Sequence, residues 1–247
     1  GACSSVTSNP AILTVDDNAV ITIQPLPVTQ CQGTTATFSV TSTGTDLNYQ
    51  WRKNGNPLVN GGDITGALSA ALTIANIETA DEGNYDVVIT GKCSIVTSTA
   101  VALNVDDNVL ITVQPDAFQD CEGETASFSV TATGTGMTYQ WRKNGAALTD
   151  GGDINGSGTP TLFIANIEPS DEGDYDVVIA GTCNIVTSNK VLLDVNEKIK
   201  ITAGPANVVQ CEGTTATFAI TATGMGPVTY QWRKDGTLIS NGGDING

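Results

Sequence analysis

Short runs of alternating apolar and polar residues follow one another along the whole chain, separated by turns rich in Gly, Asn and Asp. Alternation with a period of two is typical of strands that bury one face. In the first complete copy of this pattern, the runs predict strands at 21–25, 35–40, 49–53, 71–77, 85–89 and 101–105, with a short strand after Asn54-Gly55. Pro25 ends the first run, as at a sheet edge, because proline cannot donate to a ladder. The chain is therefore predicted to be all-β.

The strand at 49–53, Tyr-Gln-Trp-Arg-Lys, occurs again at 139–143 and at 230–234, so the chain repeats one module. The cysteines give the period, because Cys31, Cys121 and Cys211 lie 90 residues apart, as do Cys3, Cys93 and Cys183. A repeat with a fixed period is better evidence for the number of domains than chain length is.

We predict two complete modules, 17–106 and 107–196. Residues 1–16 match the end of a module and residues 197–247 match its first part, as in a window from a longer array. We expect residues 199–247 to lack a complete core and to recruit residues 1–16 of a neighbouring chain by strand addition.

Each module carries one tryptophan in an alternating strand, which is typical of the central buried strand of a small antiparallel sandwich. The predicted core tryptophans are Trp51, Trp141 and Trp232. A second signature, Asp-x-Gly-x-Tyr, ends at Tyr85 and again at Tyr175. Most of the other aromatic residues fall at the same repeat positions, so few remain for an exposed carbohydrate-binding surface.

Composition excludes several classes of function. The formal charge of −16 repels nucleic-acid phosphates and anionic lipids. The chain contains no histidine, which removes the commonest general base and zinc ligand and argues against an enzyme. No apolar run is long enough to span a membrane, and no leader peptide is evident. Six cysteines in strict register predict disulfides formed outside the cytoplasm.

The order of these signatures resembles the intermediate-set immunoglobulin domain. The matching residues are Gly33, Phe38-x-Val40, Trp51, Leu72-x-Ile74, Asp81-x-Gly83-x-Tyr85 and Leu103-x-Val105. The tandem form, with Cys-x-Gly before the second strand and Gly-x-Cys after the sixth, is similar to the repeats of very large bacterial surface adhesins. The resemblance implies a rod-like array of immunoglobulin-like sandwiches. In one departure, the family's usual core cysteines are replaced here by Val40 and Val87, so packing alone must hold the core.

Two sets of polar residues are candidates for structural or metal sites. Arg52 follows Trp51 and faces outward, where Asp86 of the neighbouring strand offers a cross-strand ion pair. The alternative is that the repeated arginine clamps a ligand.

Acidic residues at the module junction form the second set. Asp106, Asp107 and Asn108, with Asp63 from the same end of the preceding module, are candidate ligands of a calcium ion that would stiffen the array. The alternative is a solvated acidic hinge. No other cofactor is expected.

The expected topology separates cysteines within a module. Cys31 lies in the turn before the second strand and Cys93 in the turn after the sixth, and in this topology those turns are at opposite ends of the sandwich. The second strand spans about nine residues, or some 30 Å at roughly 3.3 Å each. A disulfide needs Cα atoms within about 7 Å. We therefore predict an interdomain Cys31–Cys183 bond, with the remaining cysteines paired to modules outside this window or in adjacent chains. The competing hypothesis is an altered strand order that gives Cys31–Cys93 and Cys121–Cys183.

Together these features predict a non-enzymatic, extracellular segment of the stalk or filament of a bacterial surface adhesin. Its expected partners are neighbouring copies of the same repeat and other chains of a filament. The alternative is a ligand-binding or substrate-targeting array attached to a secreted enzyme.

Overall fold

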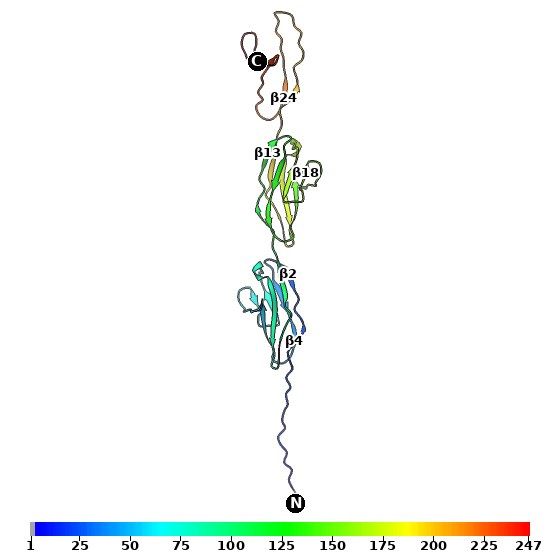
Figure 1. Cartoon of the computed structure of the whole chain (residues 1–247), viewed down its shortest axis with the longest axis vertical. Helices are drawn as coiled ribbons and strands as arrows, with labels where there is room; N and C mark the ends of the chain where they lie inside the picture. The colour runs from blue at the N-terminus through cyan, green and yellow to red at the C-terminus, as the bar shows by residue number, and fades with distance from the viewer. Residues whose placement is uncertain (1–2) are drawn as a thin grey trace. The chain divides into compact units, whose positions relative to one another are not determined.

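The alternating runs of each complete module form two layers of β-strands. Figure 1 shows the computed structural model, which describes residues 3–247. The elements of the first module are β1 (Val20–Ile23), β2 (Val28–Cys31), β3 (Ala36–Ser39), β4 (Thr41–Thr43), β5 (Asn48–Lys53), β6 (Asn56–Pro57), β7 (Ile64–Thr65), β8 (Ala71–Ile74), the 3-10 helix η1 (Thr79–Asp81), β9 (Gly83–Thr90), β10 (Ile95–Thr97) and β11 (Val101–Asp106). One sheet has the order β2-β11-β9-β5-β6, with β10 on β9, and the opposite side consists of β3-β8-β7 and the pair β1-β4.

The second module repeats this topology. Its elements are β12 (Leu110–Val113), β13 (Phe118–Cys121), β14 (Ala126–Ser129), β15 (Thr131–Thr133), β16 (Thr138–Lys143), β17 (Ala146–Ala147), β18 (Ile154–Asn155), β19 (Thr161–Ile164), η2 (Pro169–Asp171), β20 (Gly173–Ala180), β21 (Ile185–Thr187) and β22 (Val191–Asn196). The order β13-β22-β20-β16-β17 matches the larger sheet of the first module strand for strand. The predicted all-β class and repeated sandwich are confirmed.

The first predicted strand differs from the observed one. The strand β1 ends at Ile23, and after the Pro25 and Pro27 segment the chain continues as β2, which the sequence pattern did not indicate. The strand β1 pairs with β4, whereas β2 pairs with β11 of the other sheet, and this second pairing is parallel. The two prolines interrupt the ladder at the point where the chain changes sheets, because neither has an amide hydrogen to donate. In the parallel register Cys31 lies opposite Asp106.

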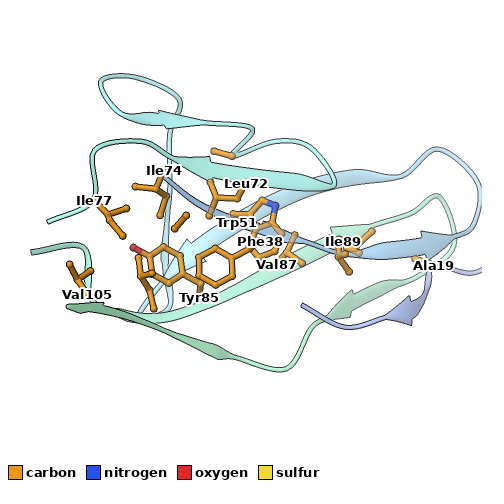
Figure 2. Close-up of a cluster of buried hydrophobic side chains, with 14 residues drawn as sticks. Ala19, Phe38, Trp51, Leu72, Ile74, Ile77, Tyr85, Val87, Ile89 and Val105 are labelled. Atoms are coloured by element: carbon orange, nitrogen blue, oxygen red, sulfur yellow. The ribbon is translucent and has the colours of Figure 1, made fainter. Parts of the chain in front are cut away.

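The core of the first module lies between the two sheets (Figure 2). The rings of Phe38 and Tyr85 stack with centroids 4.9 Å apart, and the centroid of Trp51 lies 6.1 Å from that of Phe38. All three side chains are at most 1% exposed, and the Trp51 indole N–H donates to the Ser69 carbonyl oxygen at 2.9 Å. Burying side chains of this size stabilises the fold by about 1.5–3 kcal/mol each. The predicted burial of Trp51 is therefore confirmed.

Val40 and Val87, at the positions that the resemblance to immunoglobulin domains assigns to core cysteines, are 5% and 0% exposed. Both belong to the same apolar cluster as Trp51. Apolar packing therefore replaces the usual disulfide across this core.

The described chain divides into two compact units. The first comprises the residues up to Leu110 together with Thr133–Met137 and Gly181–Asn184, which are turns of the second module. The second unit comprises Ile111–Ala132, Thr138–Ala180 and Ile185–Gly247. The turn that bears Cys183 is therefore part of the first unit.

Residues 197–247 form only β23 (Lys200–Ala203), β24 (Thr221–Thr223), β25 (Arg233–Lys234) and β26 (Thr237–Leu238). None of these residues is buried, and Phe218 and Tyr230, which the sequence pattern assigned to a core, are each 53% exposed. Trp232 is only partly buried. The segments that correspond to β2 and β3 are not strands here, because this part of the chain has no counterparts of β11 and β8 to pair with them.

Candidate functional site

A covalent link joins Cys31 to Cys183 in the first compact unit. Their Cα atoms lie 5.6 Å apart, and the bond spans a sequence separation of 152 residues. The spacing agrees with that of ordinary disulfides. This pair is the one that the topology predicted from the sequence.

Local backbone structure holds Cys31 at the end of β2. Its carbonyl oxygen accepts hydrogen bonds from the Thr34 hydroxyl at 2.6 Å and from the Thr34 amide at 3.1 Å, which closes a tight turn. Gly33 has a φ of 82°, a conformation that favours glycine, and its amide donates to the Ile77 carbonyl oxygen at 2.8 Å. The Gln32 amide donates to the Asp106 carbonyl oxygen at 2.9 Å. The turn after Cys31 is therefore anchored to β11 through Asp106 and to the loop after β8 through Ile77.

The turn that bears Cys183 is held by hydrogen bonds that sequence reasoning did not find. The Val109 amide donates to the Asn184 side-chain oxygen at 2.6 Å, and the Asn184 amide group donates back to the Val109 carbonyl oxygen at 3.2 Å. The Thr182 amide donates to the Thr135 carbonyl oxygen at 2.9 Å. These bonds fix the Cys183 turn independently of the disulfide.

The repeat contained a signal for this anchor, because Ser94 follows Cys93 as Asn184 follows Cys183. The Ser94 hydroxyl oxygen accepts from the Ala19 amide at 2.8 Å. A small polar residue directly after Cys93 and after Cys183 thus accepts the backbone amide just before the first strand of a module.

The rival pairings are not formed. Cys93 and Cys121 are free and exposed, as are Cys3 and Cys211. Within one module, Cys31 ends β2 whereas Cys93 lies in the turn between β9 and β10, so a bond between them would need an altered strand order.

The predicted calcium ligands are not brought together. Among residues 3–247 no group of three or more His, Cys, Asp or Glu side chains is placed to hold a metal ion, so the convergence expected for Asp63, Asp106 and Asp107 is wrong. Their oxygens have other roles at strand ends. The Asp107 carboxylate accepts from the Thr79 hydroxyl at 3.0 Å, and the Asp63 carbonyl oxygen accepts from the Ala75 amide at 2.9 Å.

The fourth predicted ligand, Asn108, presents its side-chain nitrogen to the Gln32 carbonyl oxygen at 3.4 Å. An amide nitrogen is not a calcium ligand, since calcium takes oxygens.

The predicted cross-strand ion pair is present. Asp86 accepts two hydrogen bonds from the Arg52 guanidinium, at 2.7 and 2.8 Å, and the second module repeats this geometry with Arg142 and Asp176. The hydrogen bond to Asp86 raises the pKa of Arg52 above its ordinary value. The Asp176 side chain is 4% exposed and that of Asp86 is 16% exposed. Because Nε and Nη2 of the arginine both donate to the aspartate, the geometry favours the structural role over a ligand clamp.

Tyr85 and Tyr175 form the turn contact that their motif indicated. The Tyr85 hydroxyl donates to the Asp81 carbonyl oxygen at 2.7 Å, and the Tyr175 hydroxyl donates to that of Asp171 at 2.8 Å. Burial, with a smaller effect of the nearby Asp81 carboxylate, raises the pKa of Tyr85 far above its ordinary value. The phenol is therefore neutral and acts as a hydrogen-bond donor.

One polar side chain in the loop after β6, and its counterpart in the loop after β17, each accept a backbone hydrogen bond that the sequence pattern did not indicate. The Asn60 side-chain oxygen accepts from the Ala67 amide at 2.8 Å, and the Asp150 carboxylate accepts from the Ser157 amide at 2.7 Å. Hydrogen bonds from the Ser157 side chain and backbone lower the pKa of Asp150. One module thus uses a neutral acceptor where the other uses a charged one.

Comparison with known families agrees with this geometry. The immunoglobulin I-set domain model matches residues 19–105 and 110–193. The chain belongs to the immunoglobulin I-set domain family. The parallel pairing of β2 with β11 and the tyrosine contacts are thus features of two successive I-set domains.

Curated relatives of this I-set chain are much longer proteins. The muscle M-line assembly protein unc-89 of Caenorhabditis elegans is 28% identical over 87% of the chain, which covers 3% of that protein. A mouse peroxidasin homolog is 25% identical over 91% of the chain and 15% of its own length. Roundabout homolog 1 of the rat is 28% identical over 68% of the chain and 11% of its own length. The chain thus spans a small fraction of these relatives, and all three are animal proteins.

Among solved structures, three titin domains, I67–I69, superpose with a TM-score of 0.74 at 18% identity, covering 93% of this chain and 83% of that one. Identity this low shows the fold alone. Within residues 3–247 we find no helix with the length and apolar character of a membrane span.

Proposed function

We propose that this chain is a non-enzymatic, extracellular structural segment of an adhesin stalk or filament. The single observation that supports the proposal most directly is the Cys31–Cys183 disulfide, which links positions 152 residues apart. Disulfides persist in oxidising compartments, which favours a location outside the cytoplasm. The likeness to a muscle M-line assembly protein is in keeping with a structural role.

We further propose that the adhesin is a bacterial surface protein, and one feature of the sequence supports this. The feature is the tandem cysteine pattern, Cys-x-Gly before one strand and Gly-x-Cys after another, repeated every 90 residues. The relatives named above are animal proteins, so they support the I-set domain and give no support to a bacterial source.

The disulfide changes how a pulling force passes along the chain. Tension applied between the two ends follows the backbone to Cys31, crosses the sulfur–sulfur bond and leaves from Cys183. Residues 32–182 are therefore shielded from extension while the bond is intact. Such a cross-link suits a segment that must keep its length under tension.

Single-molecule extension of the full chain under oxidising and reducing conditions tests this role. Because the cysteines are 152 residues apart, reduction adds about 500 Å of extensible chain at ~3.3–3.6 Å per residue. Replacing Cys93, which is free and exposed, with serine is the matched control and leaves both lengths unchanged. Equal extension with and without reductant would contradict the proposed role of the disulfide.

The second candidate, a ligand-binding array attached to a secreted enzyme, has less support. Trp51 and Trp141 are fully buried and so offer no platform for a sugar ring. Saturable binding of a glycan or protein to the full chain, lost on changing exposed residues such as Phe163 but not on reduction, would favour the array over the stalk.

A further inference from the structure

In both complete modules one layer of strands is uncharged. This layer consists of β1-β4 and β3-β8-β7 in the first module, and of β12-β15 and β14-β19-β18 in the second. Within the described chain, none of these strands contains an Asp, Glu, Lys or Arg. The larger sheet of the first module, in contrast, contains Arg52, Lys53, Asp86 and Asp106. Because the chain has a formal charge of −16, the uncharged layer is the surface on which another acidic molecule is repelled least.

The outer side of this layer in the first module presents hydroxyl and apolar side chains, and we call it the neutral face. Alternation turns Thr37 of β3 outward, opposite Thr73 of β8, and Thr73 lies opposite Thr65 of β7 as well. Ile23 of β1 is 62% exposed and lies opposite Thr41 of β4. The first module therefore has a face of short threonine side chains with an apolar border.

The neutral face of the second module carries an aromatic ring. Phe163 of β19 is 46% exposed and lies opposite Ser127 of β14 and Asn155 of β18. Val113 of β12, in the same layer, is 56% exposed. These residues belong to a complete module, and Leu162 beside Phe163 is fully buried, so no missing strand accounts for the exposed ring. Apolar side chains exposed together and bordered by polar ones mark interaction sites in soluble proteins.

The two neutral faces differ at one position in a way that makes them complementary. Thr73 of the first module corresponds to Phe163 of the second, 90 residues further along. Thr73 has only the short side chains of Thr37 and Thr65 opposite it. A phenyl ring from another molecule can therefore lie on the methyl groups of these threonines, where the ring loses its contact with water.

We infer that the neutral face of the second module in one copy packs on the neutral face of the first module in a second copy, with Phe163 on Thr37 and Thr73. Sheets packed face to face lie about 10 Å apart, which brings their side chains into contact. The occupant is a second copy because an uncharged face on a chain of charge −16 suits an uncharged partner surface, and the chain itself supplies one. The inference rests on the proposed stalk or filament function and names the contact between its chains.

The size of the face sets the strength of one contact. β3 and β4 together run from Ala36 to Thr43, which is about 26 Å at roughly 3.3 Å per residue, and four strands about 4.8 Å apart span about 19 Å. Each partner then buries about 500 Å², so the contact is near the lower limit of specific interfaces, with a dissociation constant in the micromolar range or weaker. Association through one such pair of faces is therefore expected to be reversible.

Sedimentation of the full chain measures this association. The free thiols are alkylated after folding, so that disulfide exchange cannot link the copies. We expect the mean mass to rise with protein concentration and with salt, because salt screens the repulsion between acidic copies and leaves apolar contacts in place. Monomers alone up to about 1 mM protein would overturn the inference, as would association that salt weakens. The proposed stalk function would survive either result, since its extension experiment uses single chains.

A matched pair of variants locates the contact. Phe163 and Ile185 are both exposed apolar residues of the second module, at 46% and 68%, but Ile185 lies in β21 of the larger sheet. Phe163→Asp and Ile185→Asp add the same charge. We expect Phe163→Asp to weaken the association roughly ten-fold or more and Ile185→Asp to leave it nearly unchanged, with thermal unfolding as the check that both are folded. Equal effects of the two variants would overturn the inference.

Mixing two variants tests which faces meet. Thr37→Asp places a charge on the neutral face of the first module and leaves Phe163 intact. Thr37→Asp and Phe163→Asp should each associate weakly alone, whereas their mixture should form mixed pairs, because each supplies the face that the other lacks. Undiminished self-association of Thr37→Asp would overturn the inference, since the Phe163 faces would then meet each other. A chain that stays monomeric and binds a neutral polysaccharide through Phe163 would overturn it as well.

Discussion

Replacing Cys31 with serine removes the one cross-link found in residues 3–247, and the structure sets the scale of the effect. The bond closes a loop of 152 residues. In the chain-entropy model, a loop of this size destabilises the unfolded state by about 5 kcal/mol, and measured values are typically about 2–4 kcal/mol. Because the serine leaves the strands and the turn hydrogen bonds in place, most of the loss comes from the freedom that the unfolded chain regains.

The expected loss of about 2–4 kcal/mol lowers the melting temperature by about 4–16 °C, because 1 kcal/mol shifts a unit of about 150–250 residues, the size that this loop spans, by about 2–4 °C. Calorimetry of the oxidised full chain measures it, with the free and exposed Cys93 changed to serine as the control. Cys183→Ser should have the same effect, and the double variant should lose no more than either single one. A shift of less than about 2 °C, or additive effects of the two changes, would refute the proposed stabilisation.

Three further effects can be measured by urea denaturation. Tyr85→Phe removes the hydrogen bond to the Asp81 carbonyl oxygen and should cost about 1–3 kcal/mol. Asp176→Ala leaves Arg142 without its partner and should cost about 1–3 kcal/mol, more than the equivalent change in the first module, whose aspartate is more exposed. Asp150, whose pKa is lowered, stabilises the fold above its ordinary pKa and loses this effect as the pH falls through the lowered value. Asp150→Asn should therefore reduce the loss of stability of the second module below about pH 4, and an unchanged acid profile would count against this role.

The Cys31–Cys183 pair could be predicted because the repeat fixes the topology, and topology decides which cysteines lie at the same end of a sandwich. The Arg52–Asp86 pair could be predicted for a similar reason, since alternation determines which side chains of adjacent strands face outward. Both predictions depended on backbone register alone. The prediction of calcium ligands failed because it also needed side-chain directions: the Asp107 carboxylate accepts a hydrogen bond from Thr79, and Asn108 turns its side-chain nitrogen to the Gln32 carbonyl oxygen.

The sequence by itself determined the module, its period and its buried residues, because alternation and recurrence are properties of the chain in order. Trp51 and Tyr85 are buried where the pattern places them. Only the tertiary structure decided that the chain leaves the β1-β4 pair and continues as β2, parallel to β11 of the other sheet. It also decided that residues 208–211, with the same motif as β2, form no strand. A strand needs a partner to receive its backbone hydrogen bonds, and whether that partner is present depends on residues far away in the chain.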